Sequence, residues 1–371
     1  MKIVVLAGGT SPERDVSLSS GKMIYQALRE RGHKTILLDV YLGYENKALL
    51  GNQALYDIEI EMADTAIFEK DMDWAANVAA ISSESPDIAA VKALRPDGEK
   101  NYFGPNVIAL CRAADVVFIA LHGEEGENGK IQACFDLMGI KYTGAGYLGS
   151  ALALDKILAK ELFCHHAIPT PPWVALPKGA DHGAAMAIPY PRFVKTKSGG
   201  SSVGAAIARD EAAFATALQD AYRYEDTALV EPYITGRELS VGVLAGKALP
   251  VIEIAPKQGF FDYHNKYQPG ASIETCPADI AVEMTRKLQE LAEKVYRILR
   301  MDSYARVDFI VDGEANIFCL EANTLPGMAP TSLMPKEAAA AGMDFGTFCE
   351  AIMDVSLRPP SRNLSPQGIL H

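Results

Sequence analysis

The chain has 371 residues, 49% of them hydrophobic and 22% charged, a balance typical of a globular protein with two or three domains. Its 47 acidic residues outnumber 35 Lys and Arg, and the net charge of −12 argues against a nucleic-acid partner, because nucleic-acid binders usually carry a basic excess. No run approaches the ~18 consecutive apolar residues of a membrane span, and the apolar N-terminus is too short for a signal peptide, so we expect a cytoplasmic protein without a membrane partner.

The first third of the chain alternates strand, helix and strand, which predicts an α/β fold with a doubly wound parallel sheet. In chain order we expect a strand at 3–7, a helix at 17–32, strands at 35–40 and 115–123, and a helix at 130–138. Residues 43–107 are charged and weakly periodic, so we interpret them as an elaboration of this first domain. A domain boundary is expected near 142–144.

The remaining two thirds predict mixed α and β structure. In chain order we expect a helix at 150–165, strands at 191–196 and 205–208, a helix at 211–221, strands at 228–234, 238–244 and 249–254, a helix at 280–300, strands at 304–311 and 316–322, and a helix at 344–356. The six cysteines show no C-x-x-C spacing and mostly stand in apolar runs, which favours buried free thiols over disulfides or a metal site.

The segment RVDFIV–DGEAN–IFCLEAN predicts a hairpin with a charged face. Residues two apart on a strand share a face, so Arg306 lies with Asp308, and Glu321 lies with Asn323. Such a set is poor core material, because unpaired charges are costly to bury. Oxygen ligands without His or Cys suit Mg²⁺ held jointly with phosphates. The competing interpretation is a solvated hairpin face with a salt bridge.

The segment KSGGSSVG at 197–204 predicts a flexible loop between two strands. Its backbone N–H groups and hydroxyls can surround phosphate oxygens, although it lacks the P-loop pattern and no helix follows it directly. A plain hairpin turn is the alternative. Two neighbouring lysines, Lys156 and Lys195, could neutralise a triphosphate together with the loop.

Three weaker signals lie elsewhere. Glu231 and Glu238 bracket the Thr235-Gly236 turn and fit a hinge that contacts an adenosine, although surface carboxylates are the commoner explanation. His122 follows a strand at its carboxyl end, where open α/β sheets bind ligands, but it could simply cap the next loop. Glu13 lies in the loop after the first strand, in the right place for a substrate amine, whereas the residues that follow it could serve only to cap a helix.

Taken together, these segments resemble the D-alanine–D-alanine ligases, a family of the ATP-grasp superfamily. The resemblance runs from Lys2 to about Leu357, and several motifs in the same order are more specific than any one of them. The segments that carry it are AGGTSPERDVS, ALHGEEGENG, YTGAGYLGSALALDK, VKTKSGGSSVG, FFDYHNKY, ARVDF and LEANTLPGMAPTSL.

The resemblance implies an N-terminal doubly wound domain that binds substrate, followed by a two-lobed ATP-grasp domain of α+β type. The implied ranges are 1–143 for the N-terminal domain, 144–235 for the central lobe, 236–358 for the C-terminal lobe and 359–371 for a flexible tail. The implied reaction is ATP-dependent ligation of two D-alanine molecules through an acyl phosphate, for peptidoglycan synthesis, cell-wall biogenesis and cell shape. The implied partners are ATP, D-alanine and a second copy of the chain in a homodimer.

The resemblance also implies residue roles. ATP would be bound by Lys156, Lys195, Gly200, Ser202, Glu231, Tyr233, Glu238 and Lys266. Two Mg²⁺ ions, for which Mn²⁺ can substitute, would be held by Asp308, Glu321 and Asn323. The catalytic set would be Glu13, Ser201, Tyr267, Arg306 and Gly327, and the substrate-binding set His122, Ser332 and Leu333.

Within these sets the resemblance implies more specific tasks. Arg306 and the backbone near Gly327 would stabilise a tetrahedral oxyanion. Glu13, in a network with Ser201 and Tyr267, would bind the amino group of the first D-alanine. Two further roles follow in the same way: Ser332 would bind the carboxylate of the second D-alanine, and Lys266 would move onto the γ-phosphate.

The chain departs from the family pattern in two places. Gly199 stands where many members have a bulkier, often acidic residue, which puts the closing of the 197–204 loop in question. The first domain is longer than in compact members, so the sequence does not indicate which surface would form the dimer.

Three other functions compete with this interpretation. A ligase that joins D-alanine to D-lactate would keep the ATP site, and Tyr267 is the residue that favours the dipeptide former. A non-catalytic nucleotide-binding regulator would tolerate loss of the metal ligands or of Arg306, which are all present. A dehydrogenase is suggested only by the Gly-rich end of the first strand, which lacks G-x-G-x-x-G.

Overall fold

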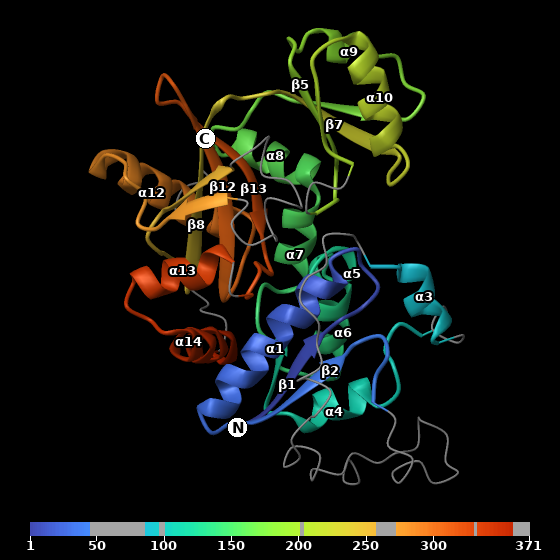
Figure 1. Ribbon diagram of the computed structural model, residues 1–371, viewed down its shortest axis with the longest axis vertical. Coiled ribbons are helices and arrows are strands. Elements are labelled where there is room, and N and C mark those ends of the chain that lie inside the picture. The colour runs from blue at the N-terminus through green and yellow to red at the C-terminus, as the bar shows by residue number, and fades with distance from the viewer. Residues whose placement is uncertain (45–85, 96–100, 201–203, 257–271, 330–331, 359–371) are drawn as a thin grey trace, which may run out of the picture.

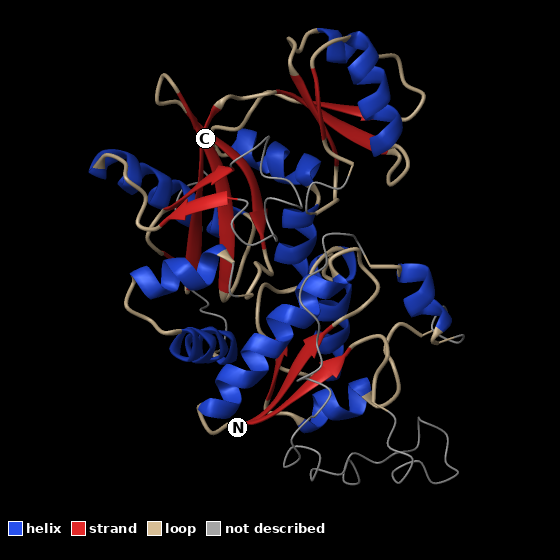
Figure 2. Ribbon diagram, viewed as in Figure 1, coloured by secondary structure: helices blue, strands red, loops and turns tan. Residues whose placement is uncertain are grey.

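The computed structural model describes residues 1–44, 86–95, 101–200, 204–256, 272–329 and 332–358. Figure 1 shows three parts: an N-terminal α/β part at one end, a small sheet with two helices at the other end, and a larger sheet beside both. Each sheet has helices against it, as Figure 2 shows by colour. Within the described residues, no helix is both long and apolar enough to cross a membrane.

The N-terminal part is built on a parallel sheet. Its strands are β1 (Lys2–Ala7), β2 (Lys34–Asp39) and β3 (Val116–Ile119), and its helices are α1 (Arg14–Glu30), α3 (Ile88–Ala93), α4 (Val107–Ala113), α5 (Glu124–Glu127) and α6 (Lys130–Met138). The strand order is β2-β1-β3 with both pairings parallel, which confirms the predicted sheet. Residues 45–85 and 96–100 of the expected elaboration lie outside the described residues.

The end of the chain completes the core of this N-terminal part. Helix α14 (Phe345–Leu357) packs on α1, and Phe348 and Ile352 are fully buried in the same apolar cluster as the three strands. Polar contacts reinforce the junction, since the Arg31 guanidinium lies 2.9 Å from the Asp344 carboxylate. The first and last helices of the described chain therefore share one hydrophobic core.

The central sheet is a small antiparallel unit. It consists of β4 (Val174–Pro177), β5 (Arg192–Thr196), β6 (Ala206–Ala208) and β7 (Thr227–Pro232) in the order β4-β7-β5-β6, with α9 (Gly183–Met186) and α10 (Glu211–Ala221) beside it. Successive side chains on a strand point to opposite faces. Val194 and Val230 therefore pack in the core beneath α10, whereas Lys195 and Glu231 point to the other face.

The C-terminal sheet has one apolar and one polar face. It consists of β8 (Gly236–Leu244), β10 (Ile252–Pro256), β11 (Ser272–Thr275), β12 (Tyr304–Asp312) and β13 (Ile317–Asn323) in the antiparallel order β11-β10-β8-β12-β13, with β9 (Lys247–Ala248) beside β8. Val241, Val307 and Cys319 belong to the apolar face, which α12 (Val282–Ile298) covers. Helices α7 (Tyr147–Leu154) and α8 (Lys156–His165) contribute to this core through Ala153, Ala159 and Phe163.

The predicted single helix at 150–165 is wrong, because α7 and α8 are separated at Asp155. The Asp155 backbone is extended (φ −77°, ψ 97°), and its carboxylate accepts hydrogen bonds from the Ile157 and Leu158 amides. Aspartate favours such an N-cap because it satisfies amides that the first turn of a helix leaves unpaired. The break leaves the Lys156 amide to donate to the Lys197 carbonyl oxygen (2.8 Å).

Other differences are local. The strand expected at 249–254 is displaced, since Pro250 lacks an amide proton and separates β9 from β10. Strands β4 and β11 and helix α13 (Leu333–Ala340) were not predicted. All six cysteines are free. Cys111, Cys319 and Cys349 are buried as expected, whereas Cys134 and Cys276 are partly buried and Cys164 is exposed.

Candidate active site

The predicted charged residues lie together on the polar face of the C-terminal sheet. In the β12–β13 ladder Arg306 is opposite Asn323 and Asp308 is opposite Glu321, so all four side chains share one face. Ser240 on β8 is opposite Asp308 and extends this face. The opposite face is apolar and buried, so strand alternation alone separates the core from the site.

Asp308 is the centre of the hydrogen bonds on this face. Its carboxylate accepts from Arg306 Nε (2.9 Å) and Nη2 (2.8 Å), from Ser240 Oγ (2.7 Å) and from Asn323 Nδ2 (2.9 Å). Burial alone would lower the pKa of Arg306, but Asp308 and then Glu321 raise it above its ordinary value, so the guanidinium keeps its charge. This bidentate pair fixes the orientation of Arg306.

The same face offers oxygen donors suited to a divalent cation. Asp308 and Glu321 are directly opposite across the hairpin, and the Asn323 amide carries a third oxygen beside them. Among the described residues, no group of three or more His, Cys, Asp or Glu side chains could hold a metal ion. Bound Mg²⁺ would therefore rely on these two carboxylates, the amide, water and phosphate oxygens, a combination that Mg²⁺ prefers.

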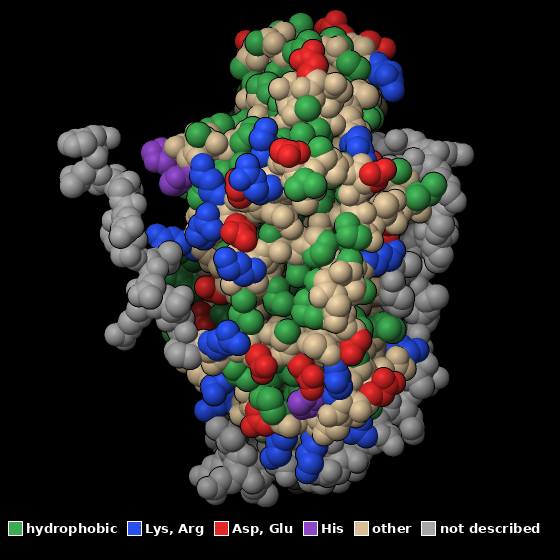
Figure 3. Space-filling view, turned by 90° about the vertical axis from the view of Figure 1, so that its left-hand side faces the viewer, with side chains coloured by type: hydrophobic (Ala, Val, Ile, Leu, Met, Phe, Trp, Pro, Cys, Tyr) green, Lys and Arg blue, Asp and Glu red, His purple; other side chains and the backbone are tan. Residues whose placement is uncertain are grey.

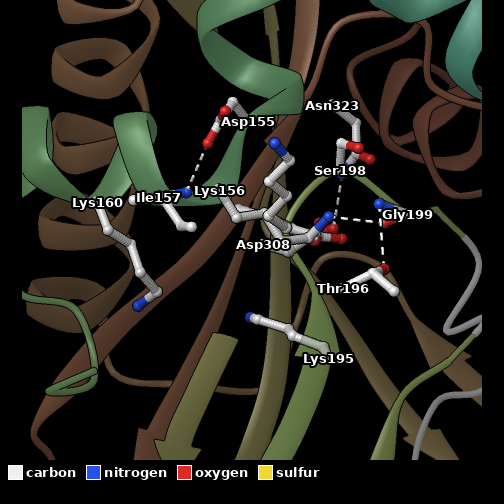
Figure 4. Close-up of polar contacts among 12 residues, drawn as sticks. Asp155, Lys156, Ile157, Lys160, Lys195, Thr196, Ser198, Gly199, Asp308 and Asn323 are labelled. Atoms are coloured by element: carbon white, nitrogen blue, oxygen red, sulfur yellow. Dashed lines mark hydrogen bonds and ion pairs between the residues drawn. The ribbon is translucent and has the colours of Figure 1, made fainter. Parts of the chain in front are cut away.

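Three lysines lie at the junction of α8 and the central sheet. Figure 4 shows that Lys160 and Lys195 point to one region, whereas Lys156 points towards Gly199. Lys156 and Lys160 come from α8, and Lys195 comes from β5. Glu231 on β7 pairs with two of them: its Oε1 lies 2.5 Å from Lys160 Nζ and its Oε2 lies 2.9 Å from Lys195 Nζ. Burial alone would raise the pKa of Glu231, but the two ammonium groups lower it, so the carboxylate stays charged.

Lys160 was not among the predicted site residues. Its position four residues after Lys156 could have indicated it, because residues four apart share one face of a helix. We call Lys160, Lys195 and Glu231 the buried trio; all three side chains are at most 10% exposed.

The Gly-rich loop begins as a structured turn. Glu225 accepts hydrogen bonds from the Lys197 amide (3.0 Å), the Ser198 amide and the Ser198 hydroxyl (2.6 Å). Lys156 Nζ donates to the Gly199 carbonyl (2.7 Å) and lies 3.5 Å from Glu321 Oε2, so it connects this loop to the charged sheet face. Glu225 is a loop anchor that the sequence analysis missed. The predicted residues Ser201 and Ser202 lie outside the described residues.

The N-terminal part contributes carboxylates to the same region. A Cβ atom on Gly200 would lie 2.7 Å from Glu13 Oε2, so the loop after β1 meets the Gly-rich loop. Glu127 Oε2 accepts from the Gly123 amide (3.1 Å). Burial, and then the nearby Glu13 carboxylate, raise the pKa of Glu127 to about 8. The structure therefore brings Glu13 to the site and adds Glu127, which was not predicted.

His122 joins the N-terminal part to the segment after β13. Its Nδ1 lies 3.0 Å from the Leu325 carbonyl oxygen, and its Nε2 lies 3.1 Å from Ser20 Oγ. Ser20 Oγ also accepts from the Met328 amide (3.2 Å). A carbonyl only accepts, so Nδ1 carries the proton, and burial lowers the pKa of His122 and keeps the ring neutral. Both ring nitrogens thus have protein partners, and His122 positions residues 325–328.

The segment after β13 carries the other predicted catalytic positions. Ser332 Oγ accepts from the Ala329 amide (3.0 Å) and would lie 2.7 Å from a Cβ on Gly327, so a side chain at 327 would displace the Ser332 hydroxyl. Ser332 is the N-cap residue of α13, although its side chain does not bond the helix amides. The Leu333 side chain packs with Ile252 and Ile254 in a small apolar cluster.

Glu337 on α13 is a further buried carboxyl that was not predicted. Its Oε1 accepts from the Gly242 amide (2.8 Å), and its Oε2 would be 2.8 Å from a Cβ on Gly242. Gly242 is opposite Arg306 in the β8–β12 ladder, so Glu337 adjoins the charged face. Burial raises the pKa of Glu337 to about 8, although the Gly242 amide and Arg306 oppose this shift.

The remaining predicted residues divide into described and undescribed ones. Glu238 is half-buried on β8 and shares the face of Ser240. The Tyr233 amide donates to the Pro191 carbonyl (2.8 Å) directly after β7. Lys266 and Tyr267 lie outside the described residues, so their predicted roles stay predictions.

A surface groove of about 680 Å³ lies away from this site. It runs between α12 and the β12–β13 turn, with Lys287, Lys294 and Asn316 among its lining residues. Figure 3 views the molecule from the side of α12 and shows Lys and Arg side chains gathered on that face with acidic ones among them. Since α12 covers the apolar face of the sheet, the groove is on the opposite side from Arg306 and Asp308.

Comparisons with known proteins agree with this arrangement. Residues 2–145 match the family model described as D-ala D-ala ligase N-terminus, and residues 162–354 match the D-ala D-ala ligase C-terminus. The D-alanine–D-alanine ligase of Pediococcus pentosaceus is 42% identical over 354 residues, which cover 95% of this chain and 97% of that protein. The enzyme of the same name from Lacticaseibacillus casei is 39% identical and covers 100% of this chain and 99% of its own length.

A solved structure supports the same assignment. The crystal structure of the D-alanine–D-alanine ligase from Bacillus anthracis complexed with ATP superposes with a TM-score of 0.71 at 26% identity, covering 96% of this chain and 97% of that one. The two family models together span most of the chain and include the charged residues of the site except Lys156 and Lys160, which lie between the two matched ranges. The chain therefore belongs to the D-alanine–D-alanine ligase family.

Proposed function

We propose that the protein joins two D-alanine molecules to D-alanyl-D-alanine at the expense of ATP, for peptidoglycan precursor synthesis. The observation that carries this proposal is a juxtaposition: a lysine-rich cluster meets a carboxylate-bearing sheet face, and Lys156 lies 3.5 Å from Glu321 where the two meet. A polyphosphate needs cationic groups on one side and a metal-binding surface on the other. Because ATP is a cytoplasmic substrate, we place the reaction in the cytoplasm.

In the first step the carboxylate of one D-alanine attacks the γ-phosphate and forms an acyl phosphate and ADP. Lys156 and Lys195 would bind phosphate oxygens, and Glu238 would bind the ribose. Asp308, Glu321 and Asn323 would hold Mg²⁺, which neutralises charge on the phosphates when bound. The chain's own contribution is mainly electrostatic, since phosphoryl transfer depends on positioning and charge stabilisation.

In the second step the amine of the other D-alanine attacks the acyl phosphate and displaces phosphate. Arg306, held by Asp308, is oriented to stabilise the negative oxygen of the tetrahedral intermediate, together with the backbone at Gly327. Glu13 would hold the ammonium group of the first D-alanine, and Ser332 the carboxylate of the second. An acyl phosphate hydrolyses readily, so the Gly-rich loop must exclude water from the site.

We further propose that the protein is a homodimer. Four large apolar side chains are exposed on α6 and α7, which pack against each other: Leu137 (91% exposed), Met138 (42%), Tyr147 (54%) and Leu148 (47%). Exposed apolar groups on neighbouring helices favour a protein partner. Sedimentation of the wild type and of Leu137→Glu tests the proposal, because a charge at the interface should shift the population towards monomer.

Phosphate release from ATP tests the proposed reaction. With Mg²⁺ present, we expect ADP and phosphate with D-alanine and none with L-alanine, and D-alanyl-D-alanine as the product. Including D-lactate and D-serine separates a dipeptide ligase from a depsipeptide ligase. Equal release with the two alanine enantiomers, or none with any D-amino acid, would overturn the substrate assignment.

A further inference from the structure

Lys160 is a fully buried charged side chain beside the proposed nucleotide site, with an exposure of 0%. Three oxygen atoms surround its ammonium group: Thr170 Oγ1 at 2.5 Å, Glu231 Oε1 at 2.5 Å and the Pro171 carbonyl at 3.3 Å. A lysine ammonium has three N–H donors. Two of these contacts are hydrogen bonds and the third is an ion pair, and the side chain is fully buried, so a ligand has no access to the Lys160 ammonium.

Lys195 differs from Lys160 in its contacts. Within the described residues its ammonium has one ion-pair partner, Glu231 Oε2 at 2.9 Å, and its side chain is 10% exposed. Since an ammonium group carries three N–H donors, a single ion pair leaves donors with which Lys195 could bind phosphate or adenine. The two lysines share one carboxylate, yet only the Lys195 side chain is partly accessible.

The net charge of the buried trio determines whether Lys195 can attract an anionic ligand. Two ammonium groups and one carboxylate leave one positive charge in a poorly solvated place, where electrostatic interactions are stronger than in water. Without Lys160, Glu231 and Lys195 would neutralise each other and no charge would remain for an anion. Lys160 thereby occupies one oxygen of Glu231 and keeps Lys195 cationic towards the ligand.

Lys160 also fixes where this charge lies. Thr170, which accepts from Lys160, donates to the Cys319 carbonyl on β13 (2.8 Å), and the Cys319 amide donates to the Pro169 carbonyl (2.8 Å). The ammonium group therefore connects β7 of the central sheet to β13 of the C-terminal sheet. These two sheets carry the lysine cluster and the metal-binding face.

We propose that Lys160 is a positioning residue for ATP: it neutralises one oxygen of Glu231 and so holds the Lys195 ammonium ready for the nucleotide. This inference rests on the proposed function only in taking ATP as the ligand. It predicts that Lys160 acts on nucleotide affinity rather than on D-alanine affinity, although Lys160 itself touches no ligand.

The test compares four variants by calorimetry with ATP and Mg²⁺ and by steady-state kinetics. Lys160→Met keeps the length of the side chain and removes the charge. We expect ATP to bind on the order of 10- to 100-fold more weakly, with the KM for D-alanine changed less than about threefold. Lys294→Met is the matched control, since its ammonium donates to the His166 carbonyl (2.6 Å) outside the site, and it should bind ATP like the wild type.

The decisive variant is the double substitution Lys160→Met with Glu231→Gln. Glu231 is itself among the expected ATP-binding residues, so the reference for the double variant is Glu231→Gln alone. With no carboxylate left for Lys160 to neutralise, adding Lys160→Met should weaken ATP binding by less than about threefold. The double variant also leaves no unpaired carboxylate, which makes it the form to compare if Lys160→Met alone does not fold. Wild-type ATP affinity in Lys160→Met, or a double variant more than about tenfold weaker than Glu231→Gln alone, would overturn the proposal.

The calorimetric test of Lys160 can be decided independently of the proposed ligase reaction. If the wild type binds ATP but releases no phosphate with D-alanine, the ligase assignment fails while the calorimetric comparison still decides the role of Lys160. A lower melting temperature of Lys160→Met without any change in ATP affinity would indicate that Lys160 is purely structural, and it would overturn the inference.

Discussion

The two sides of the site carry opposite charge imbalances. On the side of α8 and the central sheet lie three lysines, Lys156, Lys160 and Lys195. The last two share a single buried glutamate, Glu231. On the C-terminal sheet one guanidinium, Arg306, faces the carboxylates of Asp308 and Glu321. Charges that remain uncompensated near the interior are costly unless a ligand completes them.

This difference in charge indicates which ligand each side would bind. The lysine side lacks negative charge, and the sheet face lacks positive charge, so a polyphosphate with its divalent cation satisfies both at once. Neither side alone distinguishes a binding site from a structural ion-pair network. The opposition of the two, with Lys156 and Glu321 3.5 Å apart at the junction, is what favours a nucleotide with its metal.

The largest expected effect comes from the acidic side. Glu321→Gln keeps the shape of the side chain and removes the charge that would face Mg²⁺, so we expect phosphate release to fall by roughly 10²- to 10³-fold while the melting temperature changes little. Glu314→Gln, in the exposed turn of the same hairpin, is the matched control and should have wild-type activity. An unchanged rate for Glu321→Gln at saturating Mg²⁺ would remove this residue from the site.

The lysine side should affect ATP rather than D-alanine. Lys195→Met removes a poorly solvated cationic contact worth about 2–5 kcal/mol, so the KM for ATP should rise by roughly 30-fold or more, and the KM for D-alanine much less. Lys178→Met, an exposed lysine after β4 in the same lobe, should leave both KM values unchanged. Equal changes in both KM values for Lys195→Met would show that the two sides do not divide the substrates as proposed.

The N-terminal part should affect D-alanine binding through His122. His122→Phe fills the space of the ring but removes the hydrogen bonds to Leu325 and Ser20, each worth about 1 kcal/mol net. We expect residues 325–328 to loosen, the KM for D-alanine to rise about tenfold, and calorimetric ATP affinity to stay near the wild-type value. His165→Phe, on the exposed end of α8, serves as the control. Weaker ATP binding in His122→Phe would contradict this division of roles.

The smallest effect concerns stability against pH. The Glu337 pKa is raised from its ordinary 4.5 to about 8, so between these values the unfolded chain loses the proton while the folded protein keeps it. The free energy of unfolding should therefore fall as pH rises through this window, by on the order of 1 kcal/mol per pH unit, and level off above about 8. Glu337→Gln should remove the part of this slope that Glu337 contributes. The Glu127 carboxyl, whose pKa is raised in a similar way, should still contribute its own part in that variant.

Urea denaturation at several pH values measures this slope. A wild-type stability that does not fall between pH 5 and 8 would mean that Glu337 is ionised in the folded protein, and Glu337 would then count among the acidic groups of the sheet face.

Much of the fold was readable from the sequence because it depends on local patterns. Strand alternation predicted that Arg306, Asp308, Glu321 and Asn323 share one face, and the ladder confirms it. The parallel N-terminal sheet was equally predictable from its β-α-β order. The ranges proposed for the domains and the roles of the site residues remain predictions.

The residues that the sequence analysis missed depend on tertiary contacts. Glu127 and Glu337 are charged side chains whose importance comes from burial, and burial of a single charge has no periodic signature. Lys160 is also important through its burial, and its spacing from Lys156 was the one signal for it in the sequence. The break at Asp155 was missed because an aspartate inside an apolar helical pattern is compatible with a continuous exposed helix face. Its capping role depends on the bonds it makes in the folded chain.

The shared core of the first and last helices has a consequence for how the protein is made. Strands β1–β3 are synthesised well before Phe348 and Ile352, which help to bury them. Domains generally fold as units during synthesis, from the N-terminus onwards. Here the N-terminal part keeps apolar surface uncovered until α14 has been translated. A nascent chain stalled before α14 should therefore be a preferred substrate for chaperones and proteases, and its release should be the event that commits the whole molecule to its fold.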